Sequence, residues 1–242
     1  MLNKIILSPP FSNIYPNLKD TDKIVGTYTK NKRPGLYRVL TTLRYKNRSF
    51  YNNVGLRNPG IDKVKSFNNI VSISLFEKYD WVYIKNTLME KEKIKGIEFN
   101  ISCPNAQISN IDKNILESAK NITGNVIIKL PHGVNLDDIK KYADIGGNFF
   151  HISNTKKTPH GAMSGRKLKK NNLKLIEEVK NYNQDIKIIA GGGIYNIQDI
   201  NDYKTSGADH YSLSTVLLNP FRTIKIISHM SQYQKLNLDH NI

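Results

Sequence analysis

The sequence contains very little cysteine: Cys103 is the only thiol among 242 residues. A single cysteine excludes a disulfide framework within the chain, and it also excludes a metal or iron–sulfur site built from several cysteines. The six histidines include no pair at the i, i+4 spacing of a helical metal site, so we expect no bound metal. The sequence also lacks a Walker A loop and a Gly-x-Gly-x-x-Gly fingerprint.

Long hydrophobic runs are missing as well. No apolar stretch approaches the ~18 residues of a membrane span. The short apolar run before Pro9 and Pro10 is too brief for a signal peptide. The composition, with 39% hydrophobic and 23% charged residues, is that of a globular chain. We therefore expect a cytoplasmic enzyme or binding protein that is not attached to a membrane.

Acidic residues are scarce beside basic ones, at 20 against 36, which gives a formal net charge of +16. Such a charge can attract nucleic acid, and it can equally attract a small anionic substrate or cofactor. The simpler interpretation is that a lysine-rich composition spreads charge over solvated faces. The cluster from Arg166 to Lys170 opens a predicted helix and is typical of such a face. We do not expect nucleic-acid binding to be the main role.

Short apolar runs rich in β-branched residues recur along the chain and predict strands. They are Ile5–Leu7, Ile24–Tyr28, Val71–Ser74, Gly96–Asn100, Val126–Leu130, Phe149–Ser153, Ile186–Ala190 and Tyr211–Leu213. Amphipathic patterns at Leu136–Ile145 and Leu168–Val179 predict helices between the later runs. Asn196 and Asp199 mark the start of another helix, and Gly207 suits its end.

This alternation predicts an α/β fold, a single (β/α)8 TIM barrel with short loops that occupies residues 1–242. An open, doubly wound sheet has the same alternation and remains the alternative. Residues 29–69 are irregular and read as an excursion between the second and third strands. From about Tyr233 onward we expect a polar, frayed tail.

Functional groups of a parallel barrel gather where its strands end. Lys129 ends a buried run and would place a cation at the barrel mouth. Glycines 191–193 would let backbone N–H groups approach a phosphate, and Ser214-Thr215 and the glycine-flanked segment 161–165 support that interpretation. A tight turn is the alternative explanation for the three glycines.

Cys103 lies in a Ser/Pro/Asn loop, where packing gives little reason for a cysteine. Its surroundings, Asn100-Ile101-Ser102-Cys103-Pro104-Asn105, resemble the signature of the class 1 dihydroorotate dehydrogenases, FMN enzymes of pyrimidine biosynthesis built on a (β/α)8 barrel. The segment 52–60 is similar to the family's substrate-binding stretch. Further matches follow in the family's order: Lys129-Leu130-Pro131, Asn154-Thr155, Ser164-Gly165, Gly192-Gly193-Ile194 and Ser214-Thr215.

The resemblance implies a role for each matching residue. Cys103 would be the general base that removes a proton from C5 of dihydroorotate while a hydride passes from C6 to N5 of FMN. The substrate would be held by Asn52, Gly55, Leu56, Asn100, Asn105, Asn154 and Thr155. The cofactor FMN would be held by Asn100, Lys129, Ser153, Ser164, Gly165, Gly192, Gly193, Ser214 and Thr215.

The chain departs from the family pattern in residues 27–50. The family usually has a lysine and a threonine after the second strand, and Lys30 is only a loosely placed candidate for the lysine. These departures leave open a related cyclic amide as the substrate. They also leave open a flavin-dependent tRNA-dihydrouridine synthase-like enzyme, which would use the positive charge, and a non-catalytic relative.

The resemblance implies a homodimer and does not identify the electron acceptor. Fumarate-linked, NAD-linked and quinone-linked enzymes share this core. The absence of a predicted membrane helix disfavours quinone, so we expect a fumarate-like acceptor, or NAD through a partner subunit.

Overall fold

The structure is a computed structural model that describes residues 2–35, 37–46, 49–65, 68–91, 94–102, 110–153 and 155–239. For residues 39–40 and 233–239 it describes the backbone alone.

Eight parallel strands of the described chain close into a barrel, in the order β1-β12-β11-β8-β7-β6-β5-β2. Their bounds are β1 Ile5–Leu7, β2 Thr21–Tyr28, β5 Ile70–Ile73, β6 Gly96–Asn100, β7 Val126–Lys129, β8 Phe149–Ile152, β11 Lys187–Gly191 and β12 His210–Leu213. Every predicted run overlaps one of them. Because β1 pairs with both β2 and β12, the sheet has no free edge, so the barrel is confirmed over the open sheet.

The helices that follow the strands are α2 Asp80–Met89, α3 Lys113–Lys120, α4 Leu136–Asp144, α5 Lys169–Tyr182, α6 Ile197–Thr205 and α7 Pro220–Asp239. Short 3-10 turns are η1 Phe11–Ile14, η2 Ile61–Lys63, η3 Arg166–Leu168 and η4 Thr215–Leu218. The predicted start of α6 is confirmed, since Asn196 and Asp199 form a reciprocal capping box. Gly207 follows that helix with φ of +100°.

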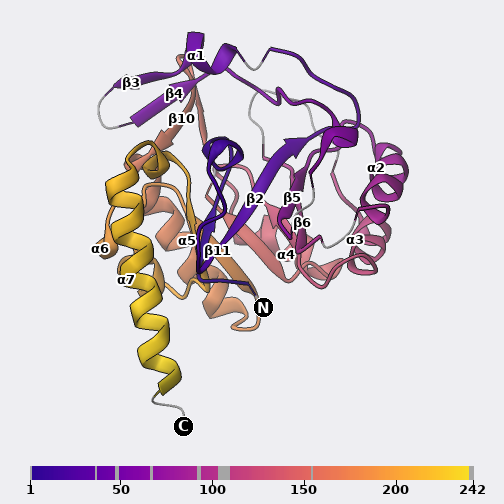
Figure 1. Cartoon of the computed structure of the whole chain (residues 1–242). Helices are drawn as coiled ribbons and strands as arrows, with labels where there is room; N and C mark the ends of the chain where they lie inside the picture. Colours follow the sequence, from indigo (N-terminus) through magenta and orange to yellow (C-terminus); the bar gives the residue numbers. More distant parts are fainter. Residues whose placement is uncertain are drawn as a thin grey trace.

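The C-terminal segment differs from its prediction. The backbone of α7 continues through position 233 to Asp239, where the sequence favours a frayed tail. This helix projects past the barrel at the end that also holds the N-terminus (Figure 1).

A second, antiparallel sheet follows the order β3-β4-β10-β9. It comprises β3 Arg44–Lys46, β4 Ser49–Asn52, β9 Lys156–Thr158 and β10 Gly161–Gly165. Together with α1 Arg38–Thr42, strands β3, β4 and β10 lie at one end of the barrel (Figure 1). The irregular excursion of the sequence thus forms part of a sheet over the barrel end where the strands finish.

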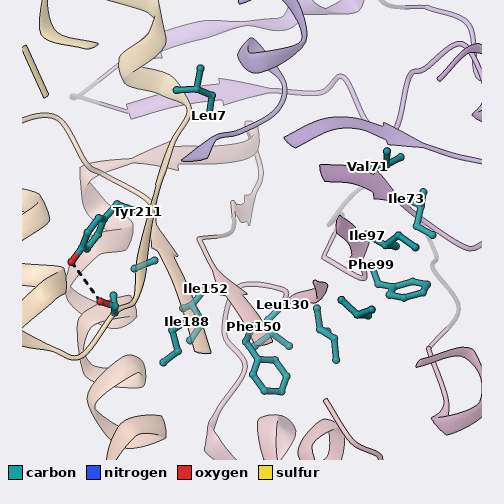
Figure 2. Packing of buried hydrophobic residues seen from close by; sticks show 14 of the residues in the cluster. Leu7, Val71, Ile73, Ile97, Phe99, Leu130, Phe150, Ile152, Ile188 and Tyr211 are labelled. Carbon is teal, nitrogen blue, oxygen red and sulfur yellow. Dashed lines mark hydrogen bonds between the residues drawn. The ribbon is translucent and has the colours of Figure 1, made fainter. Parts of the chain in front are cut away.

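Two apolar clusters fill the spaces on either side of the barrel wall. The larger one packs alternate strand residues, such as Ile73, Ile97 and Phe99, against the surrounding helices (Figure 2). The smaller one contains Leu2, Ile6, Ile24, Ile70, Ile127, Phe149 and Ile189. Because side chains alternate along a strand, this second set points into the barrel. The lower part of the barrel interior is therefore a packed apolar layer.

The inward positions turn polar toward the C-terminal ends of the same strands. Ile97 and Phe99 belong to the outer cluster, so Glu98 and Asn100 point inward. The same alternation turns Ser72, Lys129, His151 and Ser212 into the barrel. The register pairs Asn100 with Lys129 and Lys129 with His151. This polar layer forms the floor on which a site can be built.

Candidate active site

A cavity of about 1130 Å³ opens above the polar layer, between the barrel mouth and the second sheet. It is lined by every described residue for which the sequence predicts a substrate or cofactor role: Asn52, Gly55, Leu56, Asn100, Lys129, Ser153, Thr155, Ser164, Gly165, Gly192, Gly193, Ser214 and Thr215. Three predicted residues, Cys103, Asn105 and Asn154, lie outside the described residues. Pockets for drug-sized ligands measure roughly 300–1,000 Å³, so this cavity has room for more than one small molecule.

The loop after β11 brings bare backbone to the cavity. Gly192 and Gly193 have φ of +82° and +89°, in the left-handed region that favours glycine. A Cβ on Gly193 would stand 2.8 Å from Cα of Arg166, and a Cβ on Gly192 would stand 2.8 Å from Nδ2 of Asn172. Gly193 is therefore required by its close approach to the Arg166 backbone, and Gly192 is favoured by its left-handed φ.

Buried side chains hold that loop from behind. The hydroxyl of Tyr203 lies 2.7 Å from the carbonyl oxygens of both Gly191 and Gly192. Asn172 Nδ2 donates to the Gly191 carbonyl at 2.9 Å. Burial raises the pKa of Tyr203, so this hydroxyl keeps its proton and remains a donor. The glycine loop is thus fixed before any ligand binds.

Segment 161–165, which the sequence associates with phosphate binding, is strand β10 of the second sheet. Its Ala162 pairs with Asn52, and its Ser164 pairs with Phe50 of β4. A Cβ on Gly161 would stand 2.6 Å from the Asn52 carbonyl oxygen. Strand pairing therefore places one predicted cofactor segment beside one predicted substrate segment in the same sheet.

The turn from Gly55 to Gly60 is ordered by one side chain. Asn58 accepts hydrogen bonds from the backbone N–H groups of Thr29 at 3.2 Å and Gly60 at 2.9 Å. Its Nδ2 donates to Thr29 Oγ1 at 2.9 Å and to the Leu56 carbonyl at 3.1 Å. These bonds present Gly55 and Leu56 to the cavity.

Comparison with known proteins supports the same family from several directions. Residues 121–233, which run from β7 into α7, match the family model described as Dihydroorotate dehydrogenase. The "Dihydroorotate dehydrogenase B (NAD(+)), catalytic subunit" of Malacoplasma penetrans is 26% identical and covers 95% of this chain and 86% of its own. The protein of that name from Staphylococcus carnosus is 29% identical over 78% of this chain and 73% of its own.

The chain is similar to the dihydroorotate dehydrogenases over most of its length.

Among solved structures, DHODH from Eimeria tenella in complex with ferulenol superimposes with a TM-score of 0.67. It is 15% identical and covers 93% of this chain and 79% of its own, so the likeness concerns the fold alone. No helix in the described part of the chain has both the length and the apolarity to cross a membrane.

The structure shows where Lys30 lies, the loosely placed candidate for the lysine that follows the second strand in the dihydroorotate dehydrogenase pattern. Lys30 lies 3.4 Å from Asp80 and stacks near the rings of Tyr79 and Tyr83, so its charge is directed to α2. Lys129, by contrast, lines the cavity. Thr27 also lines it, accepting a hydrogen bond from Asn100 Nδ2 at 2.8 Å, and fills a place for which the sequence names no residue.

Sequence reasoning also missed a charged pair behind the cavity wall. Glu98 and His151 are both fully buried, and His151 Nδ1 lies 2.6 Å from Glu98 Oε2. Burial raises the pKa of Glu98, but the Lys129 charge and the bonds from His151 and Ser72 outweigh it and lower this pKa to about 2. Burial lowers the pKa of His151, and the opposing effect of Glu98 does not restore it. A charged residue within the apolar run Gly96–Asn100 is the signal that could have revealed the pair.

Proposed function

We propose that the chain binds FMN in this cavity and oxidises dihydroorotate to orotate. The single observation that carries the proposal is the convergence of the described, family-matching residues on one cavity at the barrel mouth. Their order along the sequence spans more than 160 residues, from Asn52 to Thr215, so their convergence is a property of the fold.

The residues fit an FMN. Gly192 and Gly193 line the cavity without side chains, as expected of a phosphate cradle. Ser214 and Ser164 line the same cavity. Lys129 supplies a positive charge at the floor, which suits the electron-rich edge of a reduced cofactor.

When bound, FMN would accept the hydride from C6 of dihydroorotate, which is chemistry that side chains cannot supply. Asparagines suit the substrate, because an amide donates and accepts at once and the ring alternates carbonyl and N–H groups. Asn52, on β4 of the second sheet, and Asn100, on β6 of the barrel, would hold that ring. Cys103 would take the C5 proton at its sulfur, and it must be a thiolate to do so.

The named relatives point to the electron acceptor. Both are called catalytic subunits of NAD(+)-linked enzymes. By analogy we propose that electrons leave this chain for NAD through a partner subunit. We also propose the homodimer that the sequence resemblance implies.

The absorption spectrum of the purified protein tests the proposal. We expect a yellow protein that releases one FMN per chain on denaturation. A colourless protein that FMN does not reconstitute would overturn the flavoenzyme assignment, and release of FAD would show that the cradle is misread. Dihydrouridine formation in folded tRNA would instead favour the RNA-modifying alternative.

A further inference from the structure

A continuous line of hydrogen bonds joins the buried Glu98 to the cavity wall on two sides. On one side, His151 Nδ1 bonds Glu98 at 2.6 Å, and His151 Nε2 lies 2.7 Å from Ser153 Oγ. On the other side, Ser72 Oγ donates to Glu98 at 2.7 Å and lies 2.9 Å from Thr27 Oγ1. Ser153 and Thr27 both line the cavity.

The ionised carboxylate fixes the direction of every proton in this line. Glu98, with its pKa lowered to about 2, only accepts hydrogen bonds. His151 must therefore donate from Nδ1, and as a neutral imidazole it keeps a lone pair at Nε2. The hydroxyl of Ser153 donates its one proton to that lone pair. Ser153 then has only lone pairs left to offer the cavity.

The second branch follows the same logic. The Ser72 hydroxyl donates its only proton to Glu98, so Thr27 must be the donor in the hydrogen bond between Thr27 and Ser72. Thr27 Oγ1 in turn accepts from Asn100 Nδ2 at 2.8 Å. This orients the Asn100 amide, whose Oδ1 accepts from the backbone N–H of Ser102 at 3.1 Å.

Packing alone gives no reason for a buried charge here. The layer directly below is filled with Ile, Leu and Phe side chains. Replacing buried ions with apolar residues of similar size is often neutral or stabilising. A carboxylate and an imidazole at 0% exposure, in a barrel that packs well with isoleucine, indicate a role toward the cavity.

The order Ser153, His151, Glu98 also matches that of a hydrolase triad, but its setting does not. A triad histidine must pass its proton to a leaving group. His151 is at 0% exposure, and the Lys129 charge opposes a positive imidazole. The histidine therefore orients Ser153 and does not activate it as a nucleophile.

We propose that Glu98 and His151 are positioning residues that hold Ser153 as a hydrogen-bond acceptor, so that the cavity selects a ring N–H at this place. The identity of the ligand rests on the proposed function. Oxidised FMN has a single ring N–H, at N3, while its N1 and N5 are acceptors that an acceptor-only Ser153 disfavours. Ser153 thus recognises the N3–H of the flavin ring.

The direction of the hydrogen bond between His151 and Glu98 is tested first, in the protein without any ligand. Nitrogen-15 NMR of the histidine-labelled protein, with the His151 signal assigned by its loss in His151→Gln, reports the tautomer. We expect a neutral ring protonated at Nδ1 at pH of about 8, above the ordinary histidine pKa. A ring protonated at Nε2, or an imidazolium at that pH, would overturn the proposal.

The acceptor role is tested by comparing the affinities of FMN and 3-methyl-FMN, in which the N3–H is replaced. The wild type should prefer FMN by roughly 10- to 100-fold, the effect of leaving a buried acceptor unpaired. In Ser153→Ala the preference should vanish because FMN binds more weakly. Ser212→Ala is the matched control, since it removes a serine hydroxyl that lines the same cavity outside the Glu98 line, and it should keep the preference.

The outcomes separate this inference from the proposed function. If neither flavin binds the wild type, the proposed function fails. If both bind it equally, the proposed function stands and the inference fails. If Ser153→Ala binds FMN as tightly as the wild type and gains only 3-methyl-FMN, the preference is steric and the acceptor role is refuted.

Discussion

Replacing Gly193 by alanine tests the phosphate cradle at a single atom. At φ of +89° an L-residue costs ~1–2 kcal/mol. The added Cβ would also stand 2.8 Å from Cα of Arg166 and 3.2 Å from the Gly165 carbonyl oxygen, both backbone atoms. Overpacking of this kind costs ~1–3 kcal/mol, so we expect a total of about 2–5 kcal/mol. At ~2–4 °C per kcal/mol for a chain of this length, the unfolding midpoint should fall by roughly 4–20 °C.

The backbone displacement that the added Cβ causes should also weaken the binding of FMN. Hydrogen bonds to a charged group contribute ~1.5–3 kcal/mol each, so moving one backbone N–H out of reach lowers affinity by roughly 10- to 100-fold. Thermal unfolding of the flavin-free protein and quenching of flavin fluorescence measure the two effects.

Gly133→Ala is a matched control for this experiment. Gly133 has the same φ of +89°, and a Cβ there would meet nothing within 4 Å. It should lose only the ~1–2 kcal/mol of the backbone term and bind FMN as the wild type does. Equal stability and equal FMN affinity for Gly193→Ala and Gly133→Ala would refute the close-approach argument.

Four further predictions concern the charge, the acid–base groups and the polar wall. The pKa values of Glu98 and His151 are both lower in the folded protein than in the unfolded chain, so their contribution to the free energy of unfolding should be complete above pH 6.5 and be lost as pH falls. For Glu98 the loss should amount to about 3 kcal/mol between pH 4.5 and about 2. Urea unfolding at a series of pH values measures this free energy, and a Glu98→Gln variant with the same acid sensitivity would contradict the prediction. Cys103→Ala should keep its flavin yet slow reduction by dihydroorotate at least ~10²-fold in stopped-flow traces, with Cys103→Ser less impaired at high pH; reduction at the wild-type rate would remove the cysteine from the mechanism. Asn100→Ala should weaken orotate binding by roughly 1–3 kcal/mol in spectral titrations, and unchanged affinity would place the ring elsewhere. RNA binding should be weak and fade steeply with salt, whereas salt-resistant binding to folded tRNA would give the charge of +16 a specific role.

The barrel could be predicted because each buried strand has a local signature. Runs such as Val126–Leu130 and Ile186–Ala190 are β-branched, continuous and bounded by polar residues. The residues that end parallel strands must meet at one mouth, so Lys129, Gly193 and Ser214 could be placed together from the strand order alone.

The second sheet has no such signature. Strand β3 is Arg-Tyr-Lys with every residue exposed, and β10 is Gly-Ala-Met-Ser-Gly. Neither sequence favours a strand on its own, and pairing with β4 decides the conformation of both. Local propensity could not reveal a structure that exists only through that pairing.

The line of hydrogen bonds around Glu98 could not be predicted from the sequence for a different reason. Its members come from β2, β5, β6 and β8, and only barrel closure and strand register bring them into contact. A histidine within Phe-Phe-His-Ile and a glutamate within Gly-Ile-Glu-Phe-Asn each mark a polar group in a buried strand. The sequence shows that each needs a partner but not that they are partners of each other.

Anaerobic reduction of the bound flavin by dihydroorotate tests the central claim most directly. We expect addition of dihydroorotate to the purified yellow protein to bleach the flavin absorbance, with one orotate formed for each flavin reduced. A flavin that dithionite reduces but dihydroorotate leaves oxidised would contradict the assignment of this cavity to dihydroorotate oxidation.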